Sequence, residues 1–199
     1  LTDVLTAYKE TGKEIYKSVF ERVISQFHAY FKEYGPVYDD LPVYAQTLLF
    51  IKAFDVLGTI PFQEDFLKLL MSYGEWLMND EYYQNNNNHG MFQNIALLHL
   101  SVLFGNCREA DVWQKQSIKR INLLFKDSYF NDFTNNEHSL SYFRYNNFLY
   151  DNAIKFCAYY KISGIEGITD KLRRSKEAFV TFAHKDGTLP LIGDGQIVK

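Results

Sequence analysis

The stretch Asn85-Asn86-Asn87-Asn88-His89-Gly90 holds the side chains of this sequence that are best suited to bind an anion. Asparagine amides compete with the backbone for hydrogen bonds, so a run of four predicts a structured turn rather than a helix interior. An apolar helical pattern follows up to Phe104, which places His89 and Gly90 in its first turn. Unpaired backbone N–H groups and the positive end of the helix dipole favour an anion there. A polar loop with a capping asparagine is the alternative interpretation.

A second polar segment is Glu137-His138-Ser139-Leu140-Ser141-Tyr142-Phe143-Arg144. Ser139 is expected to cap a helix, and Tyr142 and Arg144 would fall in its first two turns. With the Asn-His turn, this segment would bring an amide, an imidazole, a phenol and a guanidinium to one site. Such groups suit chemistry beside a carboxylate. A capping serine followed by a tyrosine at a helix interface is the alternative.

The elements that must position these groups are helices. Apolar residues recur at three- and four-residue steps, and Gly or Pro separates the periodic stretches. The pattern predicts seven helices, over residues 13–34, 42–57, 62–78, 89–104, 110–126, 139–160 and 169–183. Residues 127–138 are expected to be irregular. The short links imply antiparallel neighbours, so the predicted fold is all-α and built of helical hairpins.

The directions of these helices predict where the polar segments lie. The fourth and sixth helices share a direction, so His89 and Ser139 are expected at the same end of the fold. The seventh helix runs the other way. Its tail, with the turns Asp186-Gly187 and Gly193-Asp194-Gly195, is therefore expected at that end as well.

Composition limits the partners. The chain has 199 residues, enough for one domain with a sizeable core, and 17% of them are aromatic, which fits interhelical packing or a carbohydrate-binding surface. A net charge of −3 gives no global attraction to nucleic acid or to an anionic membrane. An anionic ligand must therefore be met by a local site. No apolar run is long enough for a membrane span.

Neither a metal nor a cofactor is predicted. His89, His138 and His184 lack the spacing of metal ligands, and His99 is expected to be a core or interface residue of its helix. The two cysteines, at positions 107 and 157, lack CxxC spacing and are expected to be buried thiols, with a disulfide between them left open.

Four segments, taken in order and spacing, resemble the heparinase II/III-like polysaccharide lyases and the related alginate lyases. The segments are Asn88-His89-Gly90 at a helix start, Trp113 in the next helix, Glu-x-Ser-x-x-Tyr at 137–142 and Asp-Gly-x-Leu-Pro-x-Ile-Gly-Asp at 186–194. The resemblance covers roughly residues 85–195. It departs from the family at Phe143, where the family often has His directly after the motif tyrosine, and this leaves the substrate open.

The resemblance implies an incomplete α/α toroid followed by a C-terminal β-sandwich, with a substrate cleft between the two. Residues 1–199 would then be a single toroid domain of a longer protein, poorly active without its sandwich partner in cis. It also implies cleavage of a uronic-acid polysaccharide by β-elimination. The polymer could be heparan sulfate, alginate or a bacterial exopolysaccharide, and the expected location is the bacterial periplasm or the exterior.

Site roles follow from the same resemblance. Asn88 and His89 would hold and neutralise the uronate carboxylate, and Tyr142 would transfer a proton. Asn87, Glu137 and Arg144 are further substrate-binding candidates. Glu137 would orient the start of the helix, and Arg144 is the nearest cation expected to act on the phenol of Tyr142.

Two other functions remain open from the sequence. An α/α-toroid glycoside hydrolase would need two carboxyl groups about 5–9.5 Å apart, and Glu137 with Asp132 or Asp194 could supply them. A non-catalytic glycan-binding or scaffold protein of a polysaccharide assembly system would use the same aromatic surface without needing Tyr142.

Overall fold

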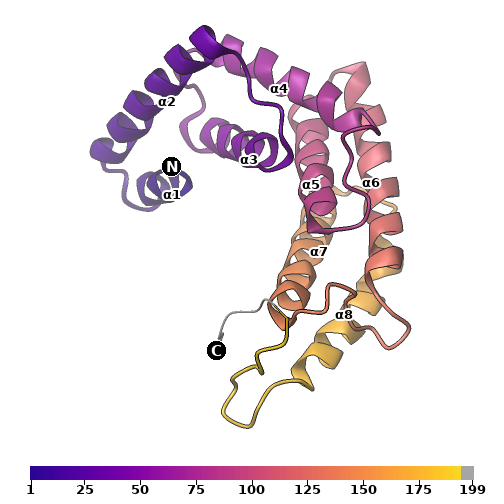
Figure 1. Ribbon diagram of the computed structural model, residues 1–199. Coiled ribbons are helices and arrows are strands. Elements are labelled where there is room, and N and C mark those ends of the chain that lie inside the picture. Colours follow the sequence, from indigo (N-terminus) through magenta and orange to yellow (C-terminus); the bar gives the residue numbers. More distant parts are fainter. Residues whose placement is uncertain (194–199) are drawn as a thin grey trace. The chain divides into compact units, whose positions relative to one another are not determined.

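The computed structural model describes residues 1–193, and these form α-helices joined by short loops (Figure 1). The helices of this part of the chain are α1 Thr2–Thr11, α2 Glu14–Tyr34, α3 Asp40–Leu57, α4 Gln63–Met78, α5 Asn88–Leu103, α6 Arg108–Ser128, α7 Leu140–Tyr160 and α8 Glu166–Val180. Within residues 1–193 the β pairing is confined to an isolated bridge between Tyr129 and Asn135. The predicted all-α class is confirmed.

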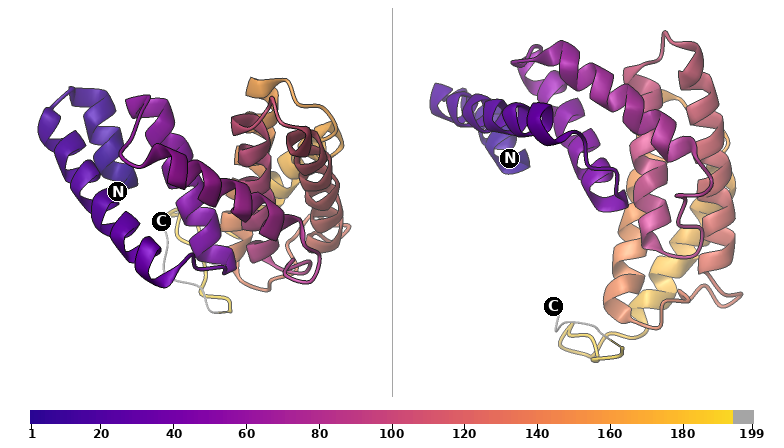
Figure 2. Two further views of the ribbon diagram at one scale, coloured as in Figure 1. Left: turned by 90° about the horizontal axis from the view of Figure 1, so that it is seen from above. Right: turned by 45° about the horizontal axis from the view of Figure 1, so that its top comes forward.

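Helix α1 corrects the predicted count of seven. Its sequence carries two threonines and an aspartate in the first five residues, which are weak helix formers, and only Leu5 is buried. So short a segment with one buried residue gives little periodicity to detect. Since α1 precedes all the predicted helices, the relative directions of the others are unaffected. Helices α7 and α8, for example, pack together and run in opposite directions (Figures 1 and 2).

The chain divides into two compact units. Unit 1 consists of Leu1–Tyr82 with Ala96–Trp113, and unit 2 consists of Tyr83–Ile95 with the chain from Gln114 onward. Helices α5 and α6 each contribute one end to unit 1 and the other to unit 2. Both polar segments singled out in the sequence lie in unit 2.

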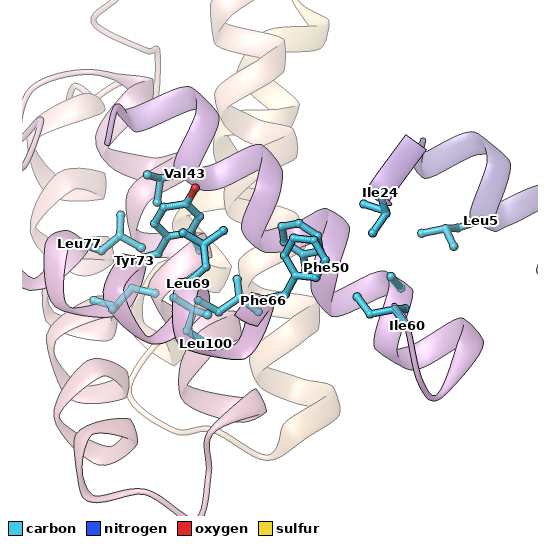
Figure 3. Packing of buried hydrophobic residues seen from close by; sticks show 14 of the residues in the cluster. Leu5, Ile24, Val43, Phe50, Ile60, Phe66, Leu69, Tyr73, Leu77 and Leu100 are labelled. Carbon is cyan, nitrogen blue, oxygen red and sulfur yellow. The ribbon is translucent and has the colours of Figure 1, made fainter. Parts of the chain in front are cut away.

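Unit 1 has an aromatic and aliphatic core (Figure 3). The rings of Phe50 and Phe66 stack with centroids 4.4 Å apart, and Phe27 stacks on Phe66 at 6.1 Å. Trp113 is 3% exposed, and a Cβ at Gly74 would collide with its indole ring. Trp113 is therefore a core residue of unit 1. His99 is partly buried, and this burial lowers its pKa to about 4, so the imidazole is neutral at physiological pH.

An ion-pair cluster on unit 1 predicts acid sensitivity. Asp65 accepts from the His28 imidazole at 2.8 Å and pairs with Lys32 at 2.9 Å, and these two contacts lower its pKa to about 2. A lowered carboxyl pKa contributes stability that is complete above about pH 4 and is lost as the pH falls towards 2. We expect Asp65→Asn to flatten the fall of the free energy of unfolding over this range, measured by urea denaturation.

The matched control for that experiment is Asp55→Asn. Asp55 pairs with Lys9 at 3.1 Å, but both side chains are more than 60% exposed. An exposed pair contributes little, so this variant should follow the acid profile of the parent. Parallel profiles for the parent and Asp65→Asn would contradict the assignment of acid sensitivity to Asp65.

The buried side of α7 makes many of the packing contacts and hydrogen bonds of unit 2. Phe143 is 3% exposed and meets Phe179 of α8 edge-on, with centroids 5.2 Å apart. The side-chain oxygen of Asn147 accepts from the hydroxyls of Tyr129 and Ser175, each at 2.9 Å. Phe143, at which the sequence departs from the family that it resembles, is thus a core residue of unit 2. Both cysteines are free thiols. Cys157 is buried, which raises its pKa to about 11, but Cys107 is only partly buried, so the expectation of two buried thiols is wrong for Cys107.

Candidate functional site

The asparagine turn caps helix α5. The side-chain oxygen of Asn87 accepts from the backbone N–H of His89 at 2.9 Å, so Asn87 satisfies one of the donors that a helix start leaves open. Asn88 is the first residue of α5 and is 8% exposed. Its side chain makes no hydrogen bond within residues 1–193. No acidic residue lies in the first turn of α5, so no negative side chain there offsets the positive end of the helix dipole.

The chain before this turn is clamped onto α5. The backbone N–H of Gln84 donates to the Gln93 side chain at 2.9 Å, and the Asn94 amide donates to the Tyr83 hydroxyl at 3.1 Å. At the same place Gly90 meets the backbone carbonyl of Gln84 so closely that a Cβ would collide with it. The glycine of the Asn-His-Gly motif therefore has a packing role, which is to let the backbone reach α5.

This close approach predicts the effect of Gly90→Ala. The added methyl must displace backbone rather than a flexible side chain, so we expect a loss of about 1–3 kcal/mol in the free energy of unfolding. Thermal and urea denaturation would measure it. The control is Gly167→Ala in α8, where a Cβ meets nothing within 4 Å. That variant should be stabilised by about 0.4–1 kcal/mol. Equal stability of the two variants would show that the approach at Gly90 is relaxed in solution.

The loop before α7 is held by amide side chains rather than by strands. The Asn146 amide donates to the Glu137 carboxylate at 3.0 Å and to the Asn135 side chain at 3.2 Å, and the Glu137 backbone N–H donates to the latter at 3.1 Å. Glu137 is thus tied to α7 through Asn146. Ser139 occupies the capping position but makes no capping hydrogen bond from its side chain. The capping expectation for Ser139 is wrong in this respect, because Asn135 and Asn146 fix the loop instead.

Tyr142 and Arg144 leave α7 on different sides. Successive helical residues are about 100° apart, so two residues separate the side chains by about 160° the short way round. Tyr142 is 36% exposed and lies one turn before Asn146 on the same side. Its hydroxyl has no hydrogen-bond partner in the described part of the chain. Arg144 is exposed on the other side, so the expectation that it is the cation beside the Tyr142 phenol is not supported.

Ring contacts join the two helix starts. The Phe92 ring of α5 meets the Tyr145 ring of α7 with centroids 5.9 Å apart, and His89 lies 6.0 Å from Phe92. Phe92 is one turn after Asn88, and Tyr145 is nearly one turn after Tyr142, so each pair shares a helix side. Both helices begin towards the same end of unit 2 (Figure 1). Asn88 and Tyr142 therefore lie one turn before a direct contact between their helices.

The segment that follows α8, up to Gly193, also returns to the start of α7 (Figure 2). A Cβ on Gly193 would lie 2.6 Å from the backbone carbonyl of His138, and Gly193 has φ 71°, a conformation that suits glycine. Asp186 accepts from the Thr188 backbone N–H at 3.0 Å and from its hydroxyl at 2.7 Å, which forms a local turn. The predicted convergence is found for Gly193 and His138. Asp194 and Gly195 lie outside the described residues.

Comparison with known proteins decides the family. A search among curated proteins finds no match. The family described as Heparinase II/III N-terminus matches residues 43–199. The chain belongs to this family.

Solved structures agree with the heparinase II/III assignment. The crystal structure of Heparinase III has a TM-score of 0.77 with 18% identity, over 92% of this chain and 29% of that one. The heparan sulfate lyase HepC from Pedobacter heparinus has a TM-score of 0.73 with 19% identity, over 98% of this chain and 32% of that one. The likeness confirms the predicted fold class, a helical toroid domain. The chain spans about a third of the length of these structures.

Several residues around this candidate site were missed in the sequence. Phe92 and Tyr145 join the two helices, Asn146 holds Glu137, and Arg120 lies 4.2 Å from the centroid of the Tyr83 ring. Spacings of three and four from Tyr142 would have pointed to Tyr145 and Asn146, since such residues share a helix side. Nothing in the sequence predicts the partner of Arg120.

Among residues 1–193, no three His, Cys, Asp or Glu side chains gather in a way that could hold a metal ion. The same part of the chain contains no helix with the length and hydropathy of a membrane span.

Proposed function

We propose that the chain is the N-terminal helical domain of a lyase that cleaves a uronic-acid polysaccharide by β-elimination. A C-terminal β-sandwich in cis would complete the enzyme, which would act in the bacterial periplasm or outside the cell. One observation carries the proposal. Asn88 and Tyr142, which the family resemblance assigns to catalysis, lie on helix sides that meet one turn further on, through Phe92 and Tyr145.

The chemistry of β-elimination explains why an amide such as that of Asn88 is useful at this site. The proton to be removed, at C5 of the uronate, lies α to a carboxylate whose charge opposes a developing carbanion. Donors placed at this carboxylate stabilise the enolate-like dianion of the transition state. Asn88 supplies a neutral donor at the start of α5. His89 adds a second donor, and the helix dipole contributes about 0.3–1 kcal/mol at an exposed site.

The phenol of Tyr142, on α7, would supply the second catalytic group. Because Arg144 lies on another side of the helix, the proposal gives Tyr142 the role of acid towards the leaving glycosidic oxygen. The O–H bond of Tyr142 breaks as the C4–O bond breaks, and the proton goes to the leaving oxygen. The base that takes the C5 proton would come from the C-terminal domain. The isolated 199-residue chain is therefore expected to be poorly active.

Two carboxylates of the hydrolase alternative, Glu137 and Asp132, are engaged in other contacts, and the third, Asp194, lies outside the described residues. The Glu137 carboxylate accepts from Asn146 at 3.0 Å. Asp132 accepts from the Thr134 backbone N–H at 3.0 Å and from its hydroxyl at 2.7 Å, and these bonds lower the pKa of Asp132. A general acid of a glycosidase needs a raised pKa. These contacts favour elimination over hydrolysis.

The test uses the full-length protein. It is incubated with heparan sulfate, alginate and an acidic bacterial exopolysaccharide, and with a neutral polymer as the control. Ultraviolet absorbance of a new C4–C5 double bond is the expected result for at least one acidic polymer. Cleavage without absorbance would replace the proposal by hydrolysis, and binding without cleavage would replace it by the scaffold function.

A further inference from the structure

Two exposed aromatic rings follow Tyr142 along helix α7. Tyr145 is 41% exposed and Phe148 is 56% exposed. Their centroids are 6.4 Å apart and their planes differ by 21°, so the rings are nearly parallel. The helix rises about 9 Å from Tyr142 to Phe148. Tyr142, Tyr145 and Phe148 are three residues apart, slightly less than one turn, so each ring lies a little further round the helix surface than the one before it. The two rings thus continue from the candidate site along the open side of α7.

The Tyr145 ring is fixed in place. It meets Phe92 edge-on at 5.9 Å, and Phe92 is 5% exposed, so one edge of the exposed ring rests on the interior of unit 2. Partial burial raises the pKa of Tyr145, and its phenol therefore keeps its proton and can donate a hydrogen bond. A ring held in this way loses little conformational freedom when a ligand binds to it.

Arg144 is a cation available to a ligand. It is exposed, it lies one turn before Phe148 on the same side of α7, and it forms no ion pair with residues 1–193. The next cation on α7, Lys155, is paired with Asp151 at 2.6 Å. Arginine binds carboxylates and sulfates through two parallel hydrogen bonds. An unpaired guanidinium beside two exposed rings is complementary to a flat ligand with an anionic group.

We propose that Arg144, Tyr145 and Phe148 form a subsite for one acidic pyranose unit of the polymer, adjacent to the position of cleavage. The C–H face of the sugar would lie on the two aromatic rings, and its carboxylate or sulfate would bind Arg144. The identity of this polymer rests on the proposed function. Continuity with Tyr142 and charge complementarity favour this occupant over the apolar face of a protein partner.

The experiment measures binding to full-length protein carrying Tyr142→Phe, so that ligands persist. Titration calorimetry is run with size-fractionated heparan sulfate and alginate oligosaccharides, and with a neutral oligosaccharide of equal length. Phe148→Ala is expected to weaken binding of the acidic ligands and the neutral ligand alike, by roughly threefold to tenfold. Arg144→Gln should weaken only the acidic ligands, by roughly tenfold, and Arg144→Lys should restore part of the loss.

The controls are two changes elsewhere on α7. Tyr159→Ala removes an aromatic ring that is 79% exposed, and Lys155→Ala removes the paired cation. Both should bind like the parent. The subsite is overturned if Arg144→Gln and Phe148→Ala also bind like the parent, or if the parent binds none of the oligosaccharides.

Failure of the subsite and failure of the proposed function give different results. If wild-type protein forms the unsaturated product while the two variants bind normally, only the subsite is overturned. If the variants bind as expected but no unsaturated product forms, the subsite stands and elimination is overturned.

Discussion

Tyr142→Phe is expected to lower kcat of the full-length lyase about 10³-fold, within the range that a positioned acid or base contributes. The change removes one hydroxyl and keeps the ring. The hydroxyl makes no hydrogen bond within residues 1–193, so the melting temperature should stay unchanged. Polymer affinity should change by less than about threefold, since the loss concerns a bond made in the transition state. Initial rates of ultraviolet absorbance and calorimetric titration measure the two quantities.

The matched control is Tyr159→Phe on the same helix. It removes the same hydroxyl from a side chain that is 79% exposed and far along α7, and its kcat should equal that of the wild type. Retained turnover in Tyr142→Phe would remove this residue from the mechanism. A large rise in KM with unchanged kcat would instead make it a binding residue.

Helix positions were predictable because the information is local. Glycines 35 and 58 end helices α2 and α3 with positive φ, and apolar steps of three and four mark the buried sides. Helix α1, over residues 2–11, was not predicted, because a single buried residue gives no periodic pattern. The general position of Asn88 and Tyr142 at one end also followed from helix directions alone, since the missed helix precedes both.

The immediate partners of the site residues were not predictable in the same way. Glu137 meets Asn146 only because the loop over residues 129–139 turns back on α7, and that path depends on Asn135 and its contact with the Ser128 carbonyl at 3.1 Å. The approach of Gln84 to Gly90 is likewise set by packing between distant elements. The placement of Arg144, in contrast, was predictable from the sequence, because helical geometry alone puts it on another side of α7 from Tyr142.

Asn88→Asp separates the chemical role of the amide from its structural role. The carboxylate has nearly the same shape, and a negative charge in the first turn of α5 interacts favourably with the helix dipole by about 0.3–1 kcal/mol. Position 88 is only 8% exposed, however, so burial of the charge opposes this gain and the melting temperature should fall modestly. Turnover should fall roughly 10²–10³-fold, the loss found when one donor to a developing oxyanion is removed. The new group accepts hydrogen bonds and repels the substrate carboxylate.

The control for charge alone is Asn86→Asp. Asn86 is exposed in the same turn, so it adds the same charge close to the site without replacing the proposed donor. Its effect should be small and should shrink further as salt shortens the Debye length from about 8 Å at 0.15 M to 3 Å at 1 M. The loss in Asn88→Asp should persist in high salt, because a missing donor is not restored by screening. Equal losses in the two variants, both reversed by salt, would mean that Asn88 acts only through local charge and makes no specific bond to the reacting uronate.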